Sequence, residues 1–222
     1  MTESAEIQHK RQSLESLRKQ VATLEAELSA VNADSQWHPE KFYSAFYATV
    51  GFMLGGVAAM ASLLFNVIGS TIAGKHPLEI IRVYLTFPLG GQALKLASAE
   101  GGGYVIDDGM ILALGCCLYI GTGMVLGTVF HWLLSRFALQ SGLLVRLIAA
   151  TVLAAIVWIV NYYAVLSWLQ PALFGGNWIT DQKLLPWWVA LSTHLVFGWT
   201  MALMLPWGRF VPYLRPTETA AA

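Results

Sequence analysis

Residues 147–160 read LIAATVLAAIVWIV, and no Asp, Glu, Lys or Arg occurs from Leu147 to Leu169. An apolar α-helix needs about 20 residues to cross the ~30 Å hydrocarbon core of a bilayer. Three other apolar runs meet this requirement, so we predict membrane spans at about residues 46–72, 110–134, 146–169 and 187–207. The sequence therefore predicts an all-α integral membrane protein, with residues 37–209 forming a four-transmembrane-helix bundle.

Composition supports the same class of protein. Hydrophobic residues make up 56% of the 222 residues and charged residues only 12%, about half the share usual in soluble domains. The mean hydropathy is +0.58. Most of the acidic charge lies in the first 41 residues, which hold five Lys or Arg and seven Asp or Glu. This distribution excludes a basic nucleic-acid-binding surface, and we expect the first span to act as its own insertion signal.

The N-terminal segment, residues 1–36, has the heptad pattern of a coiled coil. One heptad position holds Ile7, Leu14, Val21 and Leu28, and the other holds Leu17, Leu24 and Val31. Lys10 interrupts the pattern, so the apolar seam is regular only after it. We expect this helix to pack against copies of itself, giving a homo-oligomer. The alternative is an amphipathic helix on the membrane surface, but Glu15, Glu25 and Glu27 disfavour binding to anionic lipid.

The distribution of Lys and Arg predicts the orientation in the membrane. With both termini in the cytoplasm, nine of these residues lie on the cytoplasmic side and four, Lys75, Arg82, Lys95 and Lys183, on the other. The side richer in Lys and Arg is normally cytoplasmic. We therefore expect a multi-pass protein of the cell inner membrane, ending in a flexible tail at residues 210–222.

The connection at residues 73–109 is too long and too apolar to be a simple loop. Pro77 can begin a short helix that ends near Pro88 and Gly90, and Leu94 and Leu96 continue the apolar character. One side of this helix would carry Leu78, Ile81, Tyr84 and Leu85. We expect an interfacial or partly re-entrant pair of short helices.

Two of the spans share a pattern that suggests a duplicated two-helix hairpin. The second span contains LGCCLYIG, Leu114 to Gly121, and the fourth contains LSTHLVFG, Leu191 to Gly198. Both follow the pattern of a Leu, three residues, a second Leu, two bulky residues and a Gly. Such a repeat would relate the two halves by an axis along the membrane normal, although chance similarity between apolar segments remains the alternative.

The motifs THLVFGWTMAL in the fourth span and SWLQPALFGG after the third resemble four-helix bacterial inner-membrane proteins of the YagU type. The second-span glycines Gly121, Gly123 and Gly127 belong to the same resemblance, which covers about residues 45–207. It implies a four-helix bundle and supplies no catalytic residues. Cys117 stands where a His would be expected in the second span.

Four polar side chains, Asn66, Cys117, Asn161 and His194, lie roughly 6–11 Å from the same ends of their spans at the helical rise of 1.5 Å per residue. Polar residues inside a membrane are candidates for function. The alternative is that they are interhelical hydrogen-bond partners. We expect His194 to bond mainly to Asn161 or to a backbone carbonyl of the third span.

Small residues predict close helix packing. In the first span they follow each other at intervals of three or four residues, which places them on one side of a helix. This seam comprises Gly51, Gly55, Ala59, Ser62, Asn66 and Ser70, and we also expect Gly121 and Gly198 to lie at helix contacts.

No catalytic, metal or cofactor motif is present in the sequence. Haem held by His131 and His194 is disfavoured, because the two would lie about 20 Å apart along the membrane normal. We therefore expect no enzyme and no cofactor. Two functions remain: a structural or accessory subunit that joins itself or a larger membrane complex, and a small transporter or channel with a polar site near His194.

Overall fold

The computed structural model describes residues 2–34, 42–96 and 106–211, and every regular element in these ranges is helical. The chain divides into two compact units: α1 belongs to the first, and Tyr43–Phe210 forms the second. The expected tail lies outside the described residues from residue 212 onward.

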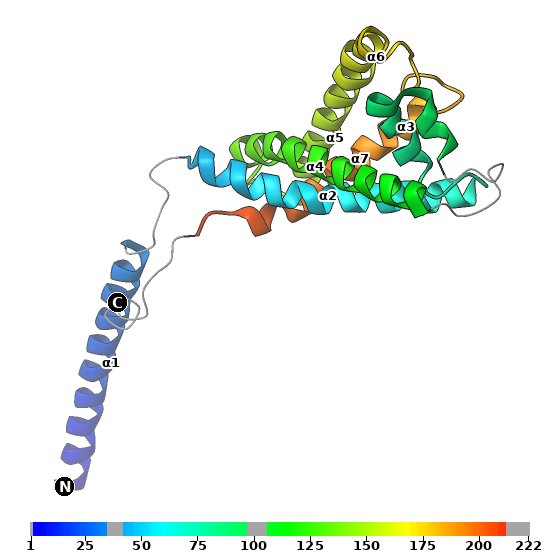
Figure 1. Cartoon of the computed structure of the whole chain (residues 1–222). Coiled ribbons are helices and arrows are strands. Elements are labelled where there is room, and N and C mark those ends of the chain that lie inside the picture. The colour runs from blue at the N-terminus through cyan, green and yellow to red at the C-terminus, as the bar shows by residue number, and fades with distance from the viewer. Residues whose placement is uncertain (1, 35–41, 97–105, 212–222) are drawn as a thin grey trace. The chain divides into compact units, whose positions relative to one another are not determined.

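α1, Thr2–Asp34, is a continuous helix of 33 residues (Figure 1). Its described seam positions are all exposed in the single chain. Leu14, Leu17, Val21, Leu24 and Leu28 are 51, 60, 52, 63 and 57% exposed, and the side chain of Val31 lies outside the described residues. The helix is therefore present, and its association with copies stays a prediction.

The four predicted spans are confirmed as helices long and apolar enough to cross a membrane. The first is α2, Ser44–Ile72, and the second is α4, Ile106–Phe137. The third is composite, with α5, Leu143–Ile159, continuing through η3, Val160–Leu166, into α6, Ser167–Phe174. The fourth is α7, Trp187–Met204, extended by η4, Leu205–Gly208. Within the second unit α2 packs against α4 and α7, and α7 packs against α5.

Glycines set the distance between α2 and α4. A Cβ atom at Gly55 would lie 2.4 Å from the carbonyl oxygen of Gly123, and one at Gly51 would lie 2.6 Å from that of Gly127. A Cβ at Gly127 would in turn lie 2.4 Å from the oxygen of Gly51. Only residues without a side chain allow two helix backbones to approach this closely.

The predicted small-residue positions differ in where they lie. Gly51, Gly55, Ala59, Ser62 and Asn66 are buried on the inner side of α2. Gly198 contacts α5, where its Cβ would lie 3.1 Å from the oxygen of Ala150. Gly121 does not belong to a helix contact, because a Cβ there would meet nothing within 4 Å.

Two apolar clusters fill the second unit. The first is centred on Phe130, Phe197 and Met201. The second includes Ile81 of α3 and Leu112 of α4. His131 is fully buried beside the first cluster. A Cβ at Gly208 would lie 2.4 Å from its Nε2, so the ring occupies the space that Gly208 leaves open.

The long connection contains α3, Glu79–Leu89, followed by η1, Gly90–Lys95. Ile81 and Leu85 point at Gly115 of α4, where a Cβ would lie 2.7 Å from each of them. α3 includes Pro88, and the residue that caps its C-terminus is Gly90, whose φ of 62° favours glycine. Two short helices are thus present, and their position at a membrane interface stays a prediction.

His76 lies in the turn between α2 and α3. Its Nδ1 accepts a hydrogen bond of 3.1 Å from the Leu78 amide. Burial, and then the positive charge of Arg82, lowers the pKa of His76 from its ordinary value of 6.5, against a smaller opposite effect of Glu79. Neutral His76 is therefore the form that this turn requires.

We predict that replacing Gly55 with Ala destabilises the second unit by about 1–3 kcal/mol, because the methyl group meets backbone atoms that no rotamer change can move aside. The control is Gly69→Ala in the same helix, where nothing lies within 4 Å of the added Cβ. That change should be neutral or stabilising by up to about 1 kcal/mol. Unfolding in detergent, followed by circular dichroism, measures both, and equal stabilities would refute the glycine contact.

We also predict that acid loosens the turn before α3. Because the folded pKa of His76 lies below the unfolded value, its contribution to stability is complete above about pH 6.5 and is lost as the pH falls toward the lowered pKa. The protection factor of the Leu78 amide, which corrects for the intrinsic pH dependence of exchange, should fall over that window. His76→Asn, whose side-chain oxygen can accept the same amide without titrating, should keep the protection factor constant. Persistence of the pH dependence in that variant would assign it to another group.

Candidate functional site

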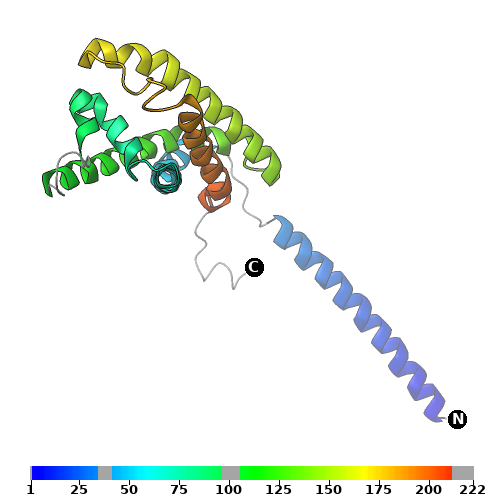
Figure 2. The ribbon, with the colours of Figure 1, turned by 90° about the vertical axis from the view of Figure 1, so that its right-hand side faces the viewer.

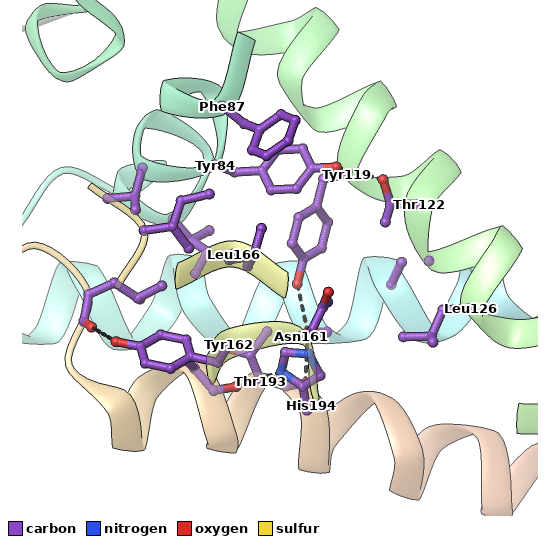
Figure 3. Close-up of a pocket in the computed structure, with 18 of the residues that line it drawn as sticks. Tyr84, Phe87, Tyr119, Thr122, Leu126, Asn161, Tyr162, Leu166, Thr193 and His194 are labelled. Carbon is purple, nitrogen blue, oxygen red and sulfur yellow. Dashed lines mark hydrogen bonds between the residues drawn. The ribbon is translucent and has the colours of Figure 1, made fainter. Parts of the chain in front are cut away.

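A cavity of about 420 Å³ lies in the second unit beneath α3 (Figure 3). Its wall includes residues of α2, α3, α4, η3, α6 and α7, together with the segment that joins α6 to α7. The volume is within the range of ligand-binding pockets, about 300–1,000 Å³. The side chains labelled in Figure 3 are Tyr84, Phe87, Tyr119, Thr122, Leu126, Asn161, Tyr162, Leu166, Thr193 and His194.

The cavity exists because the third span does not follow α4 along its whole length. Figures 1 and 2 both show the α6 end of this span lying apart from α4, with α3 in the space between them. α3 packs against both α4 and α6, whereas α5 packs mainly against α7. The side chains of α3 therefore cover the space between the two spans without filling it.

The part of the third span that faces the cavity is a π-helix, η3. Asn161, Tyr162, Val165 and Leu166 all come from this segment and line the cavity. Pro171 follows inside α6, where it has no amide hydrogen and its ring crowds the carbonyl four residues earlier, so regular α-helical bonding cannot run unbroken through this region. Single π-helical turns occur frequently at functional sites.

A cap, defined here as α3, η1 and residues 175–186, covers the cavity. Gln170 is fully buried in α6 and ties the cap to the third span. Its Nε2 donates to Thr86 Oγ1 at 3.0 Å, and its Oε1 accepts the Ile179 amide at 2.9 Å. The Trp178 ring packs over Gly91, at 3.5 Å from its Cβ position. Both halves of the cap are thus fixed to the same side chain.

A hydrogen-bonded group joins α2, α4 and α7 at the wall of the cavity. Ser62 Oγ bonds to Tyr119 Oη at 2.9 Å and donates to the Thr193 carbonyl at 3.1 Å. Asn66 Nδ2 donates to the Ser62 carbonyl at 2.8 Å and to Thr193 Oγ1 at 3.0 Å. These polar atoms therefore have partners within the protein.

The four predicted intramembrane polar residues do not form one layer. Asn161 and His194 both line the cavity, whereas Asn66 is buried behind its wall in the group just described. Cys117 lies on the exposed side of α4 and is not part of the site. His194 Nδ1 lies 2.8 Å from the carbonyl oxygen of Ala190 in its own helix, so the prediction of Asn161 or the third span as its main partner is wrong.

The chemistry that the cavity offers is apolar with a few neutral polar atoms. No Asp, Glu, Lys or Arg occurs among the residues that line it. In the described ranges, no group of three or more His, Cys, Asp or Glu could hold a metal ion. The arrangement suits an apolar ligand and offers hydrogen bonds at only a few points.

Sequence reasoning missed Tyr119, Thr193 and Gln170, which shape the site. Tyr119 and Thr193 stand in the two motifs compared above as a duplication, but residues of their type are common in apolar helices. Gln170 had the clearest available signal, since it is a polar amide in the apolar stretch SWLQPALF directly before Pro171. A polar residue at such a position needs a partner.

We predict that Gln170→Leu loosens the cap, because the change leaves the Ile179 amide without its acceptor. Amide exchange in residues 175–186 should accelerate, and unfolding should become easier by about 1–2 kcal/mol. Gln92→Leu, at an exposed position of η1, is the control and should change neither quantity. Unaltered exchange in the Gln170 variant would show that the cap is held by apolar packing alone.

No protein-family model matches the chain, and no curated protein or solved structure is significantly similar to it. The resemblance to YagU-type membrane proteins therefore stays a prediction, and the interpretation of the site depends on its own geometry.

Proposed function

We propose that the protein is a non-enzymatic structural or accessory subunit of a membrane, which oligomerises through α1 and associates with itself or with a larger membrane complex. The observation that carries this proposal is the apolar seam of α1, whose described positions are 51–63% exposed in the single chain.

Burial of the seam by a second copy is the arrangement that its pattern favours. Apolar residues at the first and fourth heptad positions fit the spaces between the same residues of a partner helix. Lys10, Glu15, Arg18, Lys19, Glu25 and Glu27 are all exposed on this helix. A helix with both signs of charge stays soluble beside the membrane while its seam is paired, whereas a membrane-surface helix would favour Lys and Arg on its polar face.

The proposal includes the inner membrane and cytoplasmic termini, for which the positions of the arginines give support. Arg136 lies in the last turn of α4, and Arg146 lies in the first turn of α5 and donates to the Leu139 carbonyl at 2.9 Å. Both flank the short connection between the second and third spans. Because two spans separate this connection from each terminus, it lies on the same side of the membrane as both termini. Positive charges close to span ends have the strongest effect on orientation.

A small transporter is the second candidate, favoured by the cavity beneath α3 with His194 in its wall. Ion transport normally requires ionisable groups that pair along a path. The cavity has no acidic or basic side chain other than this histidine, and its cap is fixed by Gln170. These features favour the accessory subunit over transport of an ion.

We predict that replacing Leu17, Leu24 and Leu28 together with Ser reduces the mass of the detergent-solubilised particle, because the seam then has no apolar surface to bury. Light scattering coupled to size-exclusion chromatography measures the mass. The matched control replaces Gln12, Lys19 and Ala26 with Ser on the opposite side of the same helix and should leave the mass unchanged.

Two results would overturn the proposal. An unchanged mass in the seam variant would show that α1 does not hold the assembly together. A pH-dependent flux in liposomes that is abolished by His194→Gln, in a protein that remains folded, would establish the transporter instead.

A further inference from the structure

We propose that the cavity beneath α3 binds a neutral membrane amphiphile, with its aliphatic chain in the apolar part of the cavity and a hydroxyl head group between Asn161 and His194. This site goes beyond the proposed function, because oligomerisation through α1 does not require it.

The size and lining of the cavity indicate an aliphatic chain. Its volume of about 420 Å³ is large enough for a small ligand, and much of its wall consists of Leu, Ile, Val and Phe side chains. A space of this kind inside a membrane protein is more stable when filled by an apolar molecule than when filled by water, because water there would lack hydrogen-bond partners. The adjacent bilayer supplies such molecules.

Most polar groups in the wall are already used by the protein. Tyr119 bonds to Ser62, Thr193 bonds to Asn66, and Tyr162 donates to the Leu185 carbonyl at 3.2 Å. The side-chain amide of Asn161, in contrast, has no hydrogen-bond partner among the described residues. Asn161 of η3 and His194 of α7 both line the cavity (Figure 3). The unused hydrogen-bonding capacity therefore lies in the part of the wall that η3 and α7 form.

The tautomer of His194 specifies what the head group must offer. The carbonyl of Ala190 can only accept, so Nδ1 of the neutral ring carries the hydrogen that it donates over 2.8 Å. Nε2 is then an acceptor, and it has no partner in the described ranges. A hydroxyl can donate to Nε2 and accept from the side-chain amide of Asn161, so one group supplies the donor that the ring lacks and an acceptor for one amide hydrogen.

Charge excludes the other common head groups. A carboxylate would have no hydrogen to donate to Nε2, and no Lys or Arg lines the cavity to balance its charge. An ammonium group could donate to Nε2, but it would have no Asp or Glu beside it. Burial of an unpaired charge is more costly than burial of a hydroxyl that has both its partners.

A route from the bilayer is present on the α4 side. Leu118 and Thr122 line the cavity and are also exposed on the surface of α4. Thr122 bonds to Tyr84 of α3 at 2.6 Å, so a polar contact marks this edge of the cavity. The cavity therefore extends to residues on the exposed surface of α4, and entry at this edge requires the Tyr84–Thr122 hydrogen bond to open.

The test uses the full chain in phosphatidylcholine nanodiscs with a monopalmitoylglycerol that carries a photoreactive diazirine in its chain. Peptide mapping should place saturable labelling on residues 118–126 and 161–169. Unlabelled monopalmitoylglycerol should compete at least about tenfold better than palmitate, palmitoylamine or lysophosphatidylcholine, since each charged head group leaves a charge unpaired. Equal competition by lysophosphatidylcholine would identify the occupant as an ordinary bilayer chain and overturn the hydroxyl assignment.

Matched variants connect the labelling to the cavity. Val165→Trp fills it and should abolish saturable labelling, whereas Val160→Trp, at a half-exposed position of the same π-helix outside the lining, should not. Leu169→Trp is the second filling variant if Val165→Trp fails to fold. Labelling that persists in the folded filling variant would refute the site.

The head-group position is tested separately. Asn161→Leu removes the amide donor and should reduce the preference for monopalmitoylglycerol over palmitate by about tenfold, the effect expected for one hydrogen bond to a buried group. Chain labelling should remain, because the apolar wall is intact. An unchanged preference would show that the head group lies elsewhere, and this result would leave oligomerisation through α1 untouched.

Discussion

The contact between the backbones of α2 and α4 is the constraint on which the rest of the second unit depends. Gly51 and Gly55 on one helix meet Gly123 and Gly127 on the other, with no side chain between them. Inside a membrane, apolar side chains gain little by leaving lipid, so association depends on close packing and hydrogen bonds. Here the close approach brings Ser62 of α2 within hydrogen-bonding distance of Tyr119 of α4. The same face of α2 then receives Thr193 of α7.

The close packing of α2 against α4 and α7 contrasts with the looser packing of the third span. α5 is held against α7, where Gly198 fits against Ala150 and Ala154, but the helix then changes to π-helical geometry and ends beyond Pro171. Contact with α4 is not continued over this part, and α3 bridges the difference through Ile81 and Leu85 on one side and Thr86 on the other. The cavity is the volume left between a tight pair of helices and a span that cannot follow them.

Much of the secondary structure could be predicted from the sequence, because hydrophobic length and heptad spacing are local properties. The four spans and the helical N-terminal segment needed no knowledge of tertiary contacts. The inner face of α2 was also readable, since small residues at intervals of three or four can lie only on one side. The composite third span could not be predicted, because π-helical bonding over Val160–Leu166 has no sequence signature comparable to a heptad.

The site was predictable only in part, and for a physical reason. Counting depth along a helix gives the height of a residue but not the direction in which it points. Asn161, His194 and Cys117 were all placed at similar depth, yet Cys117 faces outward from α4. Likewise, depth does not identify the partner of His194, which is the Ala190 carbonyl one turn back in its own helix. The sequence indicates that Gln170 needs a hydrogen-bond partner but not which one, because Thr86 lies 84 residues before it and Ile179 lies in a cap whose fold the sequence does not reveal.

The close contacts at glycine also differ in what sequence change they can tolerate. At Gly208 the obstacles to a larger residue are side-chain atoms, those of the His131 ring and Cγ1 of Val50, so smaller side chains at positions 131 and 50 could make room and these positions are free to vary together. At Gly55 the obstacles are the Gly123 carbonyl oxygen and the Gly127 Cα, which no substitution removes. Compensation there requires the helices themselves to move. Among related chains, position 208 should therefore covary with positions 131 and 50, whereas the α2 and α4 glycines should remain invariant or change only with the geometry of both helices.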